Sequence, residues 1–170
     1  MAATNELLID TNILRRNSLR NRLTEHIRSG QLRVYVPTII HAERVRQLAD
    51  DRGEAFAIEV VRQQVAQSEF DLLPFTTADA EALADLWPDL KAAVEPAGNA
   101  DDYWRRNCID ILLCAVARSR GYTLVTDDKG QHFDWLVVER MDTGALSLWL
   151  DNSDSGNPLP VQDELRGQMR

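Results

Sequence analysis

The stretch Leu7-Leu8-Ile9-Asp10-Thr11-Asn12 decides the fold. It opens with three consecutive apolar residues, which is typical of a short strand buried on both faces. Comparable apolar runs recur further along the chain, at Val34-Tyr35-Val36, Tyr122-Thr123-Leu124-Val125-Thr126 and Leu136-Val137-Val138. Strands of this kind occur mainly in parallel sheets whose two faces are covered by helices.

Helical patterns separate these runs, over residues 12–29, 38–50, 53–68, 77–95 and 104–120. Strands that alternate with helices predict an α/β protein, with a three-layer α/β/α architecture around a central, mainly parallel twisted sheet. For a chain of 170 residues we expect a single domain over residues 1–150. Residues 151–170 are rich in Pro, Ser, Asn and Asp, and we expect them to form a loosely ordered tail.

The composition is that of an ordinary water-soluble globular protein, with 44% hydrophobic and 27% charged residues. No stretch approaches 18 consecutive apolar residues, and the first residues lack the pattern of a signal peptide. Cys108 and Cys114 fall on one predicted helix, six residues apart, which is too far along the axis for a disulfide. We therefore expect a cytoplasmic protein with reduced thiols and no membrane partner.

Charge is distributed unevenly along the chain. The formal net charge is −8, which argues against non-specific binding of nucleic acid by the whole surface. From Leu14 to Arg46, however, eight arginines stand against two glutamates, whereas Thr76 to Asp102 holds seven acids and one lysine. This asymmetry indicates a basic face for a polyanion, although charge counting alone leaves two solvated helix faces as an equal alternative.

Three acidic residues directly follow predicted strands. Asp10 comes after the first apolar run, and Asp127 and Asp128 come after the run that ends at Thr126. Ligands of open α/β sheets bind in the crevice at the carboxyl ends of the strands. We therefore expect Asp10 to meet the Asp127–Asp128 pair at that edge, despite their distance in sequence.

Two further acids occupy apolar faces of predicted helices. Glu43 lies one turn after Ile39 and Ile40, and Asp110 is followed by Ile111 and apolar residues on its own face. An isolated buried carboxylate is costly and needs a partner. Taken alone, each could be an ion-paired core residue; together with the strand-end acids, they indicate a shared site.

Four carboxylates in one cleft repel one another, and their pKa values rise unless a cation intervenes. Oxygen ligands favour Mg²⁺ or Mn²⁺. Zinc fits poorly, because neither the two cysteines nor His26, His41 and His132 show a metal-ligand spacing. His132 could approach the site from a loop.

Four short motifs in this order resemble those of PIN-domain nucleases. They are Leu7–Asn12, Pro37–Glu43, Asp110–Ala117, and Leu124–Asp128 with Phe133 downstream. Each motif is weak alone, whereas four in the right order and spacing are specific. The resemblance spans about residues 6–140 and implies a PIN-like fold.

The resemblance also implies a set of site residues. Asp10, Glu43, Asp110 and Asp128 are similar to the catalytic acidic quartet that binds Mg²⁺ or Mn²⁺, with Asp10 and Asp110 as the direct ligands. Asn12 and Thr126 resemble the polar residues that order those carboxylates. Asp127 occupies a variable position beside them, and the register leaves either Asp127 or Asp128 as the fourth acid.

The implied activity is metal-dependent hydrolysis of RNA phosphodiester bonds by an activated water. Small PIN proteins of this kind are often toxins of VapBC-type toxin–antitoxin pairs, which implies a cognate antitoxin partner, and they are often homodimers. Arginines near the acids are candidates for contacts with RNA phosphates: Arg15, Arg16, Arg20, Arg105 and Arg106.

Other functions remain open on the sequence alone. A PIN nuclease could act in RNA maturation or defence without an antitoxin, or the fold could be a catalytically inactive binding scaffold. A phosphorylated receiver module would need paired acids after the first strand, where this chain offers only Asp10. A haloacid-dehalogenase-type phosphatase would need Asp-x-Asp, where this chain has Asp10-Thr11-Asn12.

Overall fold

The computed structural model describes residues 5–136 and 138–152. Strands and helices alternate along the chain as follows: β1 (Asn5–Ile9), α1 (Thr11–Leu14), α2 (Asn17–Arg28), β2 (Leu32–Pro37), α3 (Thr38–Arg52), α4 (Glu54–Gln67), β3 (Asp71–Leu73), α5 (Thr77–Val94), α6 (Ala100–Arg120), β4 (Thr123–Val125), α7 (His132–Trp135), β5 (Arg140–Met141) and α8 (Thr143–Asn152). The predicted α/β class is confirmed.

The five strands form one parallel sheet in the order β3-β2-β1-β4-β5. β1 lies in the middle, where Leu7 pairs with Val34 on one side and with Thr123 on the other. Because the strands are parallel, all their carboxyl ends lie at the same edge. The ends of β1 and β4 are therefore neighbours at that edge.

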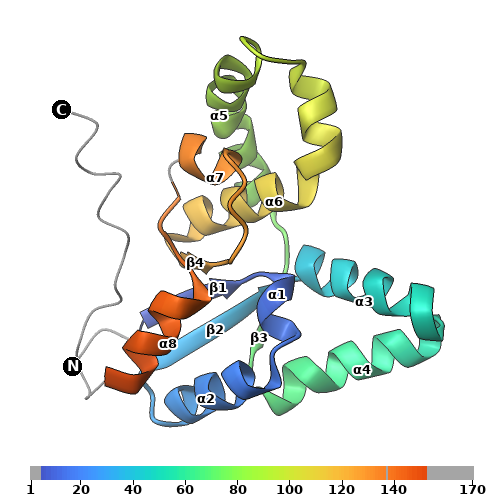
Figure 1. The fold of residues 1–170 in the computed structure, drawn as a ribbon, viewed down its shortest axis with the longest axis vertical. Helices are drawn as coiled ribbons and strands as arrows, with labels where there is room; N and C mark the ends of the chain where they lie inside the picture. Colours follow the sequence, from blue (N-terminus) through green and yellow to red (C-terminus); the bar gives the residue numbers. More distant parts are fainter. Residues whose placement is uncertain (1–4, 137, 153–170) are drawn as a thin grey trace.

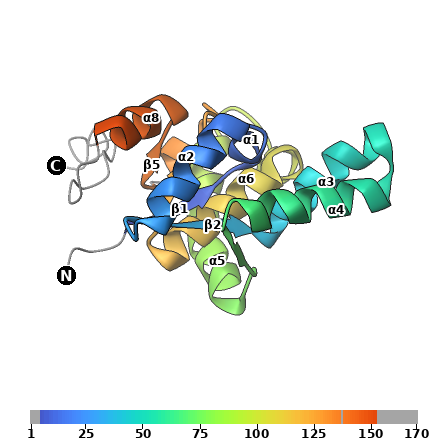
Figure 2. The same ribbon diagram turned by 90° about the horizontal axis from the view of Figure 1, so that it is seen from below.

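Helices cover both faces of the sheet, as expected for a three-layer α/β/α protein. Figure 1 shows α5, α6 and α7 on one side, and α1, α2 and α8 on the other. Figure 2 shows the α3–α4 hairpin extending sideways from the body of the molecule. Between the layers, the side chains of Leu7, Leu8 and Ile9 are fully buried, in agreement with the buried strand predicted there.

Some predicted elements differ from the structure. The strand expected at Leu136-Val137-Val138 is wrong in position, because the strand of this region, β5, lies further along the chain at Arg140–Met141. Leu136 is the C-cap of α7, and residue 137 lies outside the described residues. β3 was not predicted, because it is a three-residue edge strand with two exposed positions. The helix expected over 12–29 is divided into α1 and α2.

The C-terminal part of the chain, the cysteines and the length of the helices bear on three further expectations. The expected loose tail lies outside the described residues from position 153 onward, while α8 continues to Asn152. Cys108 and Cys114 are both free thiols, as expected. Within the described ranges, every helix is too short or too polar to cross a membrane.

A backbone break in α6 orients its second half. Asn107 has non-helical dihedral angles (φ −121°, ψ 17°). Its side-chain amide donates to the backbone carbonyl of Tyr103 at 2.8 Å, at the end of the preceding turn. Side-chain hydrogen bonds of this kind compete with the helical pattern of the backbone. The break separates a first half, partly packed against the core through Tyr103 and Trp104, from a second half that begins just before Asp110 and enters the core.

Candidate functional site

Asp10 lies where β1 ends and α1 begins, and only 4% of the residue is exposed. As the N-cap of α1, it accepts a hydrogen bond from the backbone N–H of Thr11 at 2.5 Å and one from the Thr11 hydroxyl at 3.0 Å. Carboxylates are favourable caps because helix N-termini carry unpaired N–H donors and a partial positive charge. The local sequence therefore fixes this carboxylate before any ligand is present.

Asn12 and Thr126 hold the second oxygen of the same carboxylate. The Asn12 amide donates to Asp10 Oδ2 at 3.2 Å, and the Thr126 hydroxyl donates to it at 2.9 Å. The Thr126 hydroxyl also accepts from the backbone N–H of Asp128 at 3.0 Å. Thr126 thus connects the end of β1 to the loop after β4, and it joins two of the predicted acids.

Glu43 reaches this region from the second turn of α3. Burial raises the pKa of its carboxyl, and the charge of Asp10 raises it further. Hydrogen bonds from Thr11 and Gln47 and the charge of Arg46 act in the opposite direction, the Gln47 amide donating at 3.3 Å. The net shift is upward, so the donors around Glu43 do not compensate for its burial.

Asp110 stands just after the break in α6 and has the most strongly perturbed carboxyl of the group. Its pKa is raised to about 7, first by burial and then by the charges of Asp10, Asp128 and Glu43. Acids from four separate elements therefore act on one another at this edge of the sheet. A carboxyl group in these surroundings is unstable in its charged form unless a cation is nearby.

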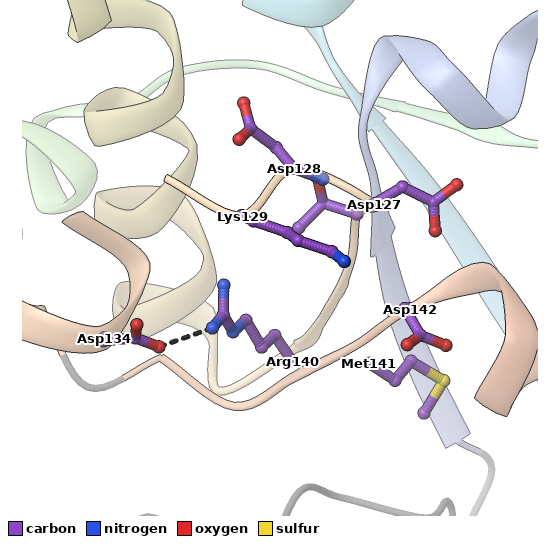
Figure 3. A pocket seen from close by; sticks show the side chains of 8 residues that line it. Asp127, Asp128, Lys129, Asp134, Arg140, Met141 and Asp142 are labelled. Atoms are coloured by element: carbon purple, nitrogen blue, oxygen red, sulfur yellow. Dashed lines mark hydrogen bonds and ion pairs between the residues drawn. The ribbon is translucent and has the colours of Figure 1, made fainter. Parts of the chain in front are cut away.

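Asp127 and Asp128 point in opposite directions, as Figure 3 shows. Asp128 acts on Asp110, and its Oδ1 accepts from the backbone N–H of Gly130 at 2.8 Å. Asp127 instead accepts from the backbone N–H and the hydroxyl of Thr143, at 2.9 and 3.0 Å. Of these two neighbouring acids, Asp128 is therefore the one whose charge acts on Asp110.

Asp127 connects loops and has no hydrogen bond to the acidic cluster among the described residues. Burial alone would raise the pKa of its carboxyl, but the hydrogen bonds from Thr143 and the charge of Arg16 lower it. Arg16 donates to Asp127 at 2.6 Å and to the Thr143 hydroxyl at 2.6 Å. Asp127 therefore attaches α8 to the α1–α2 connection, and its predicted role in ordering the site carboxylates stays a prediction.

Two of the five arginines predicted to contact RNA are already committed elsewhere. Arg16 is bound to Asp127 and Thr143, as described above. Arg20 is buried, and it donates to the backbone carbonyl of Leu14 and to Asn17. In this structure both guanidinium groups are bound within the chain, and their contact with RNA stays a prediction. Their partners could not be read from a basic stretch of sequence, because a charge count does not show which side chains turn inward.

The other three arginines are exposed. Arg15 is the C-cap of α1, and Arg105 and Arg106 lie on the first half of α6. Arg105 forms a surface ion pair with Asp102 at 3.6 Å, and Arg106 donates to the Asp102 backbone carbonyl at 3.2 Å. Such exposed contacts contribute little and are readily exchanged for others. These three arginines therefore remain available to a ligand.

A pocket of about 290 Å³ opens beside Asp128, between the loop after β4 and the segment that carries β5 (Figure 3). Lys129 and Arg140 bring two cationic side chains to its lining. Arg140 is paired with Asp134, whereas no ion pair of Lys129 is found within residues 5–136 and 138–152. Sequence reasoning missed Lys129, although its place directly after the strand-end acids was a usable signal.

The four acids influence one another's charge, but their oxygens are not positioned to bind one metal ion together. Within the part of the chain that the structure describes, no three carboxylate, imidazole or thiolate side chains lie close enough together to hold a metal ion. The four acids thus share one electrostatic environment, while their oxygens remain apart. Asp10 is buried and held by several hydrogen bonds, whereas Asp128 is exposed and is held through Oδ1 by the backbone N–H of Gly130.

The chain is similar to known proteins in its sequence family and in its fold. The family model described as PIN domain matches residues 7–134. Among curated proteins, none matches the sequence significantly.

Several solved structures share the fold. A DNA-bound VapBC from Salmonella typhimurium aligns with a TM-score of 0.61 at 18% identity, over 82% of this chain and 98% of that one. VapBC-1 from nontypeable Haemophilus influenzae gives 0.59 at 17% identity, over 81% and 97%. FitAcB from Neisseria gonorrhoeae gives 0.53 at 23% identity, over 79% and 96%. At these identities the likeness concerns the fold.

Proposed function

The chain belongs to the PIN domain family, and from this premise we propose that it is a metal-dependent endoribonuclease. The observation that supports this most is the state of Asp110, whose pKa is raised to about 7 by burial and by the charges of Asp10, Asp128 and Glu43. Four mutually repelling acids destabilise a fold unless a cation is bound among them. Perturbed acids at the ligand-binding edge of a sheet are typical of a functional site.

The chemistry of the donor set fits Mg²⁺ or Mn²⁺. Every candidate ligand is a carboxylate oxygen, which hard divalent cations prefer, and such sites keep several water ligands. Asp10 and Asp110 would hold the ion directly, with Glu43 and Asp128 completing the set. Because the oxygens are separated in this structure, the site needs the less restrained side chains to move inward when an ion enters.

The residues of the chain prepare the reaction by orienting the acids. Asn12 and Thr126 keep Asp10 Oδ2 directed toward the cluster, and Thr11 holds Oδ1. When bound, a divalent cation supplies a water of lowered pKa and stabilises charge on the phosphate and on the leaving oxygen. The described residues of the cluster include no serine or cysteine suited to act as a nucleophile, and hydrolysis by water requires none.

RNA would be held by local cations, because the chain as a whole is acidic. Arg15 is exposed at the end of α1, five residues after Asp10; Lys129 follows Asp128 and lines the pocket beside it; and Arg105 and Arg106 are exposed on α6. Contacts of this kind bind phosphates and fix the path of the strand, but do not read its sequence. Unpaired RNA can reach such an edge more easily than a duplex can.

The biological role we propose is that of the toxin in a VapBC-type toxin–antitoxin pair, with a cognate antitoxin as partner. The proteins of similar fold include VapBC assemblies, two of which were solved with DNA. A cationic side chain from a partner would relieve the repulsion around Asp110 as a metal ion does. A nuclease of RNA maturation or defence is the alternative role, and a homodimer remains a prediction, to be tested by measuring the mass in solution.

The separation of the acid oxygens favours one second candidate, a PIN-fold scaffold that binds partners without catalysis. One experiment separates the two. Purified chain is incubated with a pool of single-stranded RNA and Mg²⁺ or Mn²⁺, next to an EDTA control, and Asp10→Asn is compared with Asp89→Asn. Asp89 is an exposed acid of α5, so its substitution removes the same charge away from the cluster.

The nuclease predicts cleavage that requires the metal, persists in Asp89→Asn and is lost in Asp10→Asn. Absence of cleavage by folded wild-type chain, together with absence of Mn²⁺ binding, would contradict the nuclease and support the scaffold.

A further inference from the structure

His132 carries a buried polar atom with no hydrogen-bond partner. Only 2% of the residue is exposed, and its Nε2 is unpaired within the described residues. The Oδ2 atom of Asp110 lies 3.8 Å from this nitrogen. An unpaired buried nitrogen is costly, and native structures rarely retain one without a functional reason. The direction of this nitrogen, toward a member of the acidic cluster, supplies such a reason.

Tyr103 occupies the other nitrogen of the same ring. Its hydroxyl lies 3.1 Å from His132 Nδ1. An ionised Asp110 can only accept hydrogen bonds. A neutral imidazole that donates to it through Nε2 must therefore carry its proton on Nε2. Nδ1 is then an acceptor, and the Tyr103 hydroxyl is the donor placed to satisfy it. A tautomer with the proton on Nε2 therefore suits both neighbours of the ring.

The surroundings hold the imidazole in place. The Phe133 ring packs against it with centroids 4.3 Å apart, and the Tyr103 ring lies edge-on at 6.1 Å. A Cβ atom at Gly130 would collide with the imidazole, so glycine is needed where the loop passes the ring. The backbone N–H of Gly130 also binds Asp128 at 2.8 Å. The loop that carries one acid thus packs directly against the histidine that faces another.

Resting on the proposed function, we propose that His132 is a positioning residue for Asp110, with Nε2–H donating to Oδ2 and the Tyr103 hydroxyl fixing the tautomer. The separation of 3.8 Å exceeds a hydrogen bond, and a small rotation of the Asp110 side chain closes it. Groups that orient a metal-binding carboxylate typically change metal affinity or activity by about 10- to 100-fold when removed.

The test compares four variants of the full chain with the wild type. His132→Leu removes the donor, His132→Gln keeps an N–H at a similar reach, and Tyr103→Phe removes only the hydroxyl. Tyr35→Phe is the matched control, because it removes a half-buried hydroxyl that is bound to Glu6, toward the opposite end of the strands. The measurements are Mn²⁺ binding by titration, the thermal midpoint, and kcat and KM on single-stranded RNA.

We expect His132→Leu to weaken Mn²⁺ binding about tenfold or more and to lower kcat with KM unchanged. His132→Gln should stay within about threefold of the wild type, Tyr103→Phe should fall between the two, and Tyr35→Phe should match the wild type. The thermal midpoint of His132→Leu should stay close to that of the wild type, because removal of the unpaired Nε2 offsets loss of the contact between Nδ1 and the Tyr103 hydroxyl.

Three outcomes would overturn the inference. Unchanged Mn²⁺ affinity in His132→Leu would make the histidine a core residue only. Equal losses in the leucine and glutamine variants would show that the donor is not what matters. Loss of Mn²⁺ binding with Mg²⁺ binding retained would indicate direct ligation by the imidazole. A wild-type chain that neither binds Mn²⁺ nor cuts RNA would instead contradict the proposed function itself.

Discussion

Two aspartates on helices that cover the same face of the sheet have their pKa values shifted in opposite directions. Asp79, at the start of α5, is fully buried, and its pKa is lowered to about 2. Asp110, in the second half of α6, is partly buried, and its pKa is raised to about 7. Burial raises the pKa of both carboxyls, so the difference comes from their partners.

The partners of Asp79 are donors. Arg120 binds it through two nitrogens at 3.1 and 3.2 Å, the Ser119 hydroxyl donates to it, and it forms a capping box with Thr76. The partners of Asp110 are three other acids and an imidazole nitrogen beyond hydrogen-bond distance. A carboxylate with a structural role is stabilised by hydrogen-bond donors of the protein. A carboxylate that binds a cation has no such partner until the cation arrives.

The largest effect should come from Asp110→Asn. Removing one carboxylate of the cluster should lower the rate of RNA cleavage on the order of a thousandfold, since metal ions contribute several kcal/mol to such reactions. The free energy of unfolding should stay unchanged or rise, because a repelled charge has been removed. Cleavage rates and urea unfolding of the same preparation measure both. A variant that loses stability instead would place Asp110 with the structural acids.

Asp79→Asn should show the reverse pattern. Arg120 would remain beside a group that no longer carries charge, and breaking a buried pair of this kind costs about 3 kcal/mol of unfolding free energy. At temperatures where the variant is still folded, its rate of RNA cleavage should equal that of the wild type. A specific loss of activity in a folded Asp79→Asn chain would break the division between the two aspartates.

The pH dependence of stability sharpens the comparison. Without divalent metal, folded Asp110 keeps its proton up to pH about 7, whereas an aspartate in the unfolded chain ionises near 3.8. The stability that Asp110 contributes is therefore complete below pH 3.8 and is lost as the pH rises through 7. The contribution of Asp79 has the opposite sign: it is present above pH 3.8 and disappears as the pH falls toward 2.

Urea unfolding in EDTA from pH 4 to 8 measures the first of these contributions. The wild type should lose on the order of 2 kcal/mol relative to Asp110→Asn across this range, after allowance for solvent screening. If the unfolding free energies of the two proteins changed in parallel with pH, the pKa of Asp110 would not be raised in the folded chain.

The smallest effect concerns the cations near each aspartate. Arg120 is bound to Asp79, whereas Lys129 lines the open pocket beside Asp128. Lys129→Ala should raise KM for RNA a few-fold and reduce the salt dependence of binding by about 0.7 in the log–log slope, the value for one phosphate contact on a single strand. Arg33→Ala, at an exposed site near the start of β2, is the control. Equal effects of the two substitutions would mean that only net charge matters.

The acidic edge could be predicted because it depends on local rules. Short apolar runs mark parallel strands, and Asp10 and Asp128 directly follow two of them. Parallel strands end at one edge, so neighbours in space follow from the topology. The family resemblance then added Glu43 and Asp110, which single-residue arguments left open as ion-paired core residues.

The remaining details depend on contacts between distant residues. Asp127 and Asp128 are adjacent in sequence, and Thr143 and Arg16 decide which of them turns away from the cluster. Asp79 appeared only as one acid of a charged stretch, since its partner Arg120 lies 41 residues away. β3 escaped prediction because two of its three residues are exposed. A pattern in one segment cannot reveal a partner supplied by another.

The most direct test of the shared acidic site is the pKa of Asp110 itself, measured by carbon NMR of the labelled carboxyl group with and without Mg²⁺. Asp10→Asn serves as the control for coupling between the acids. We predict a pKa of about 7 without metal, a lower value when Asp10 is neutralised, and a large downward shift when Mg²⁺ is added. A pKa near 3.8 that responds neither to Mg²⁺ nor to Asp10→Asn would contradict a common site for these acids.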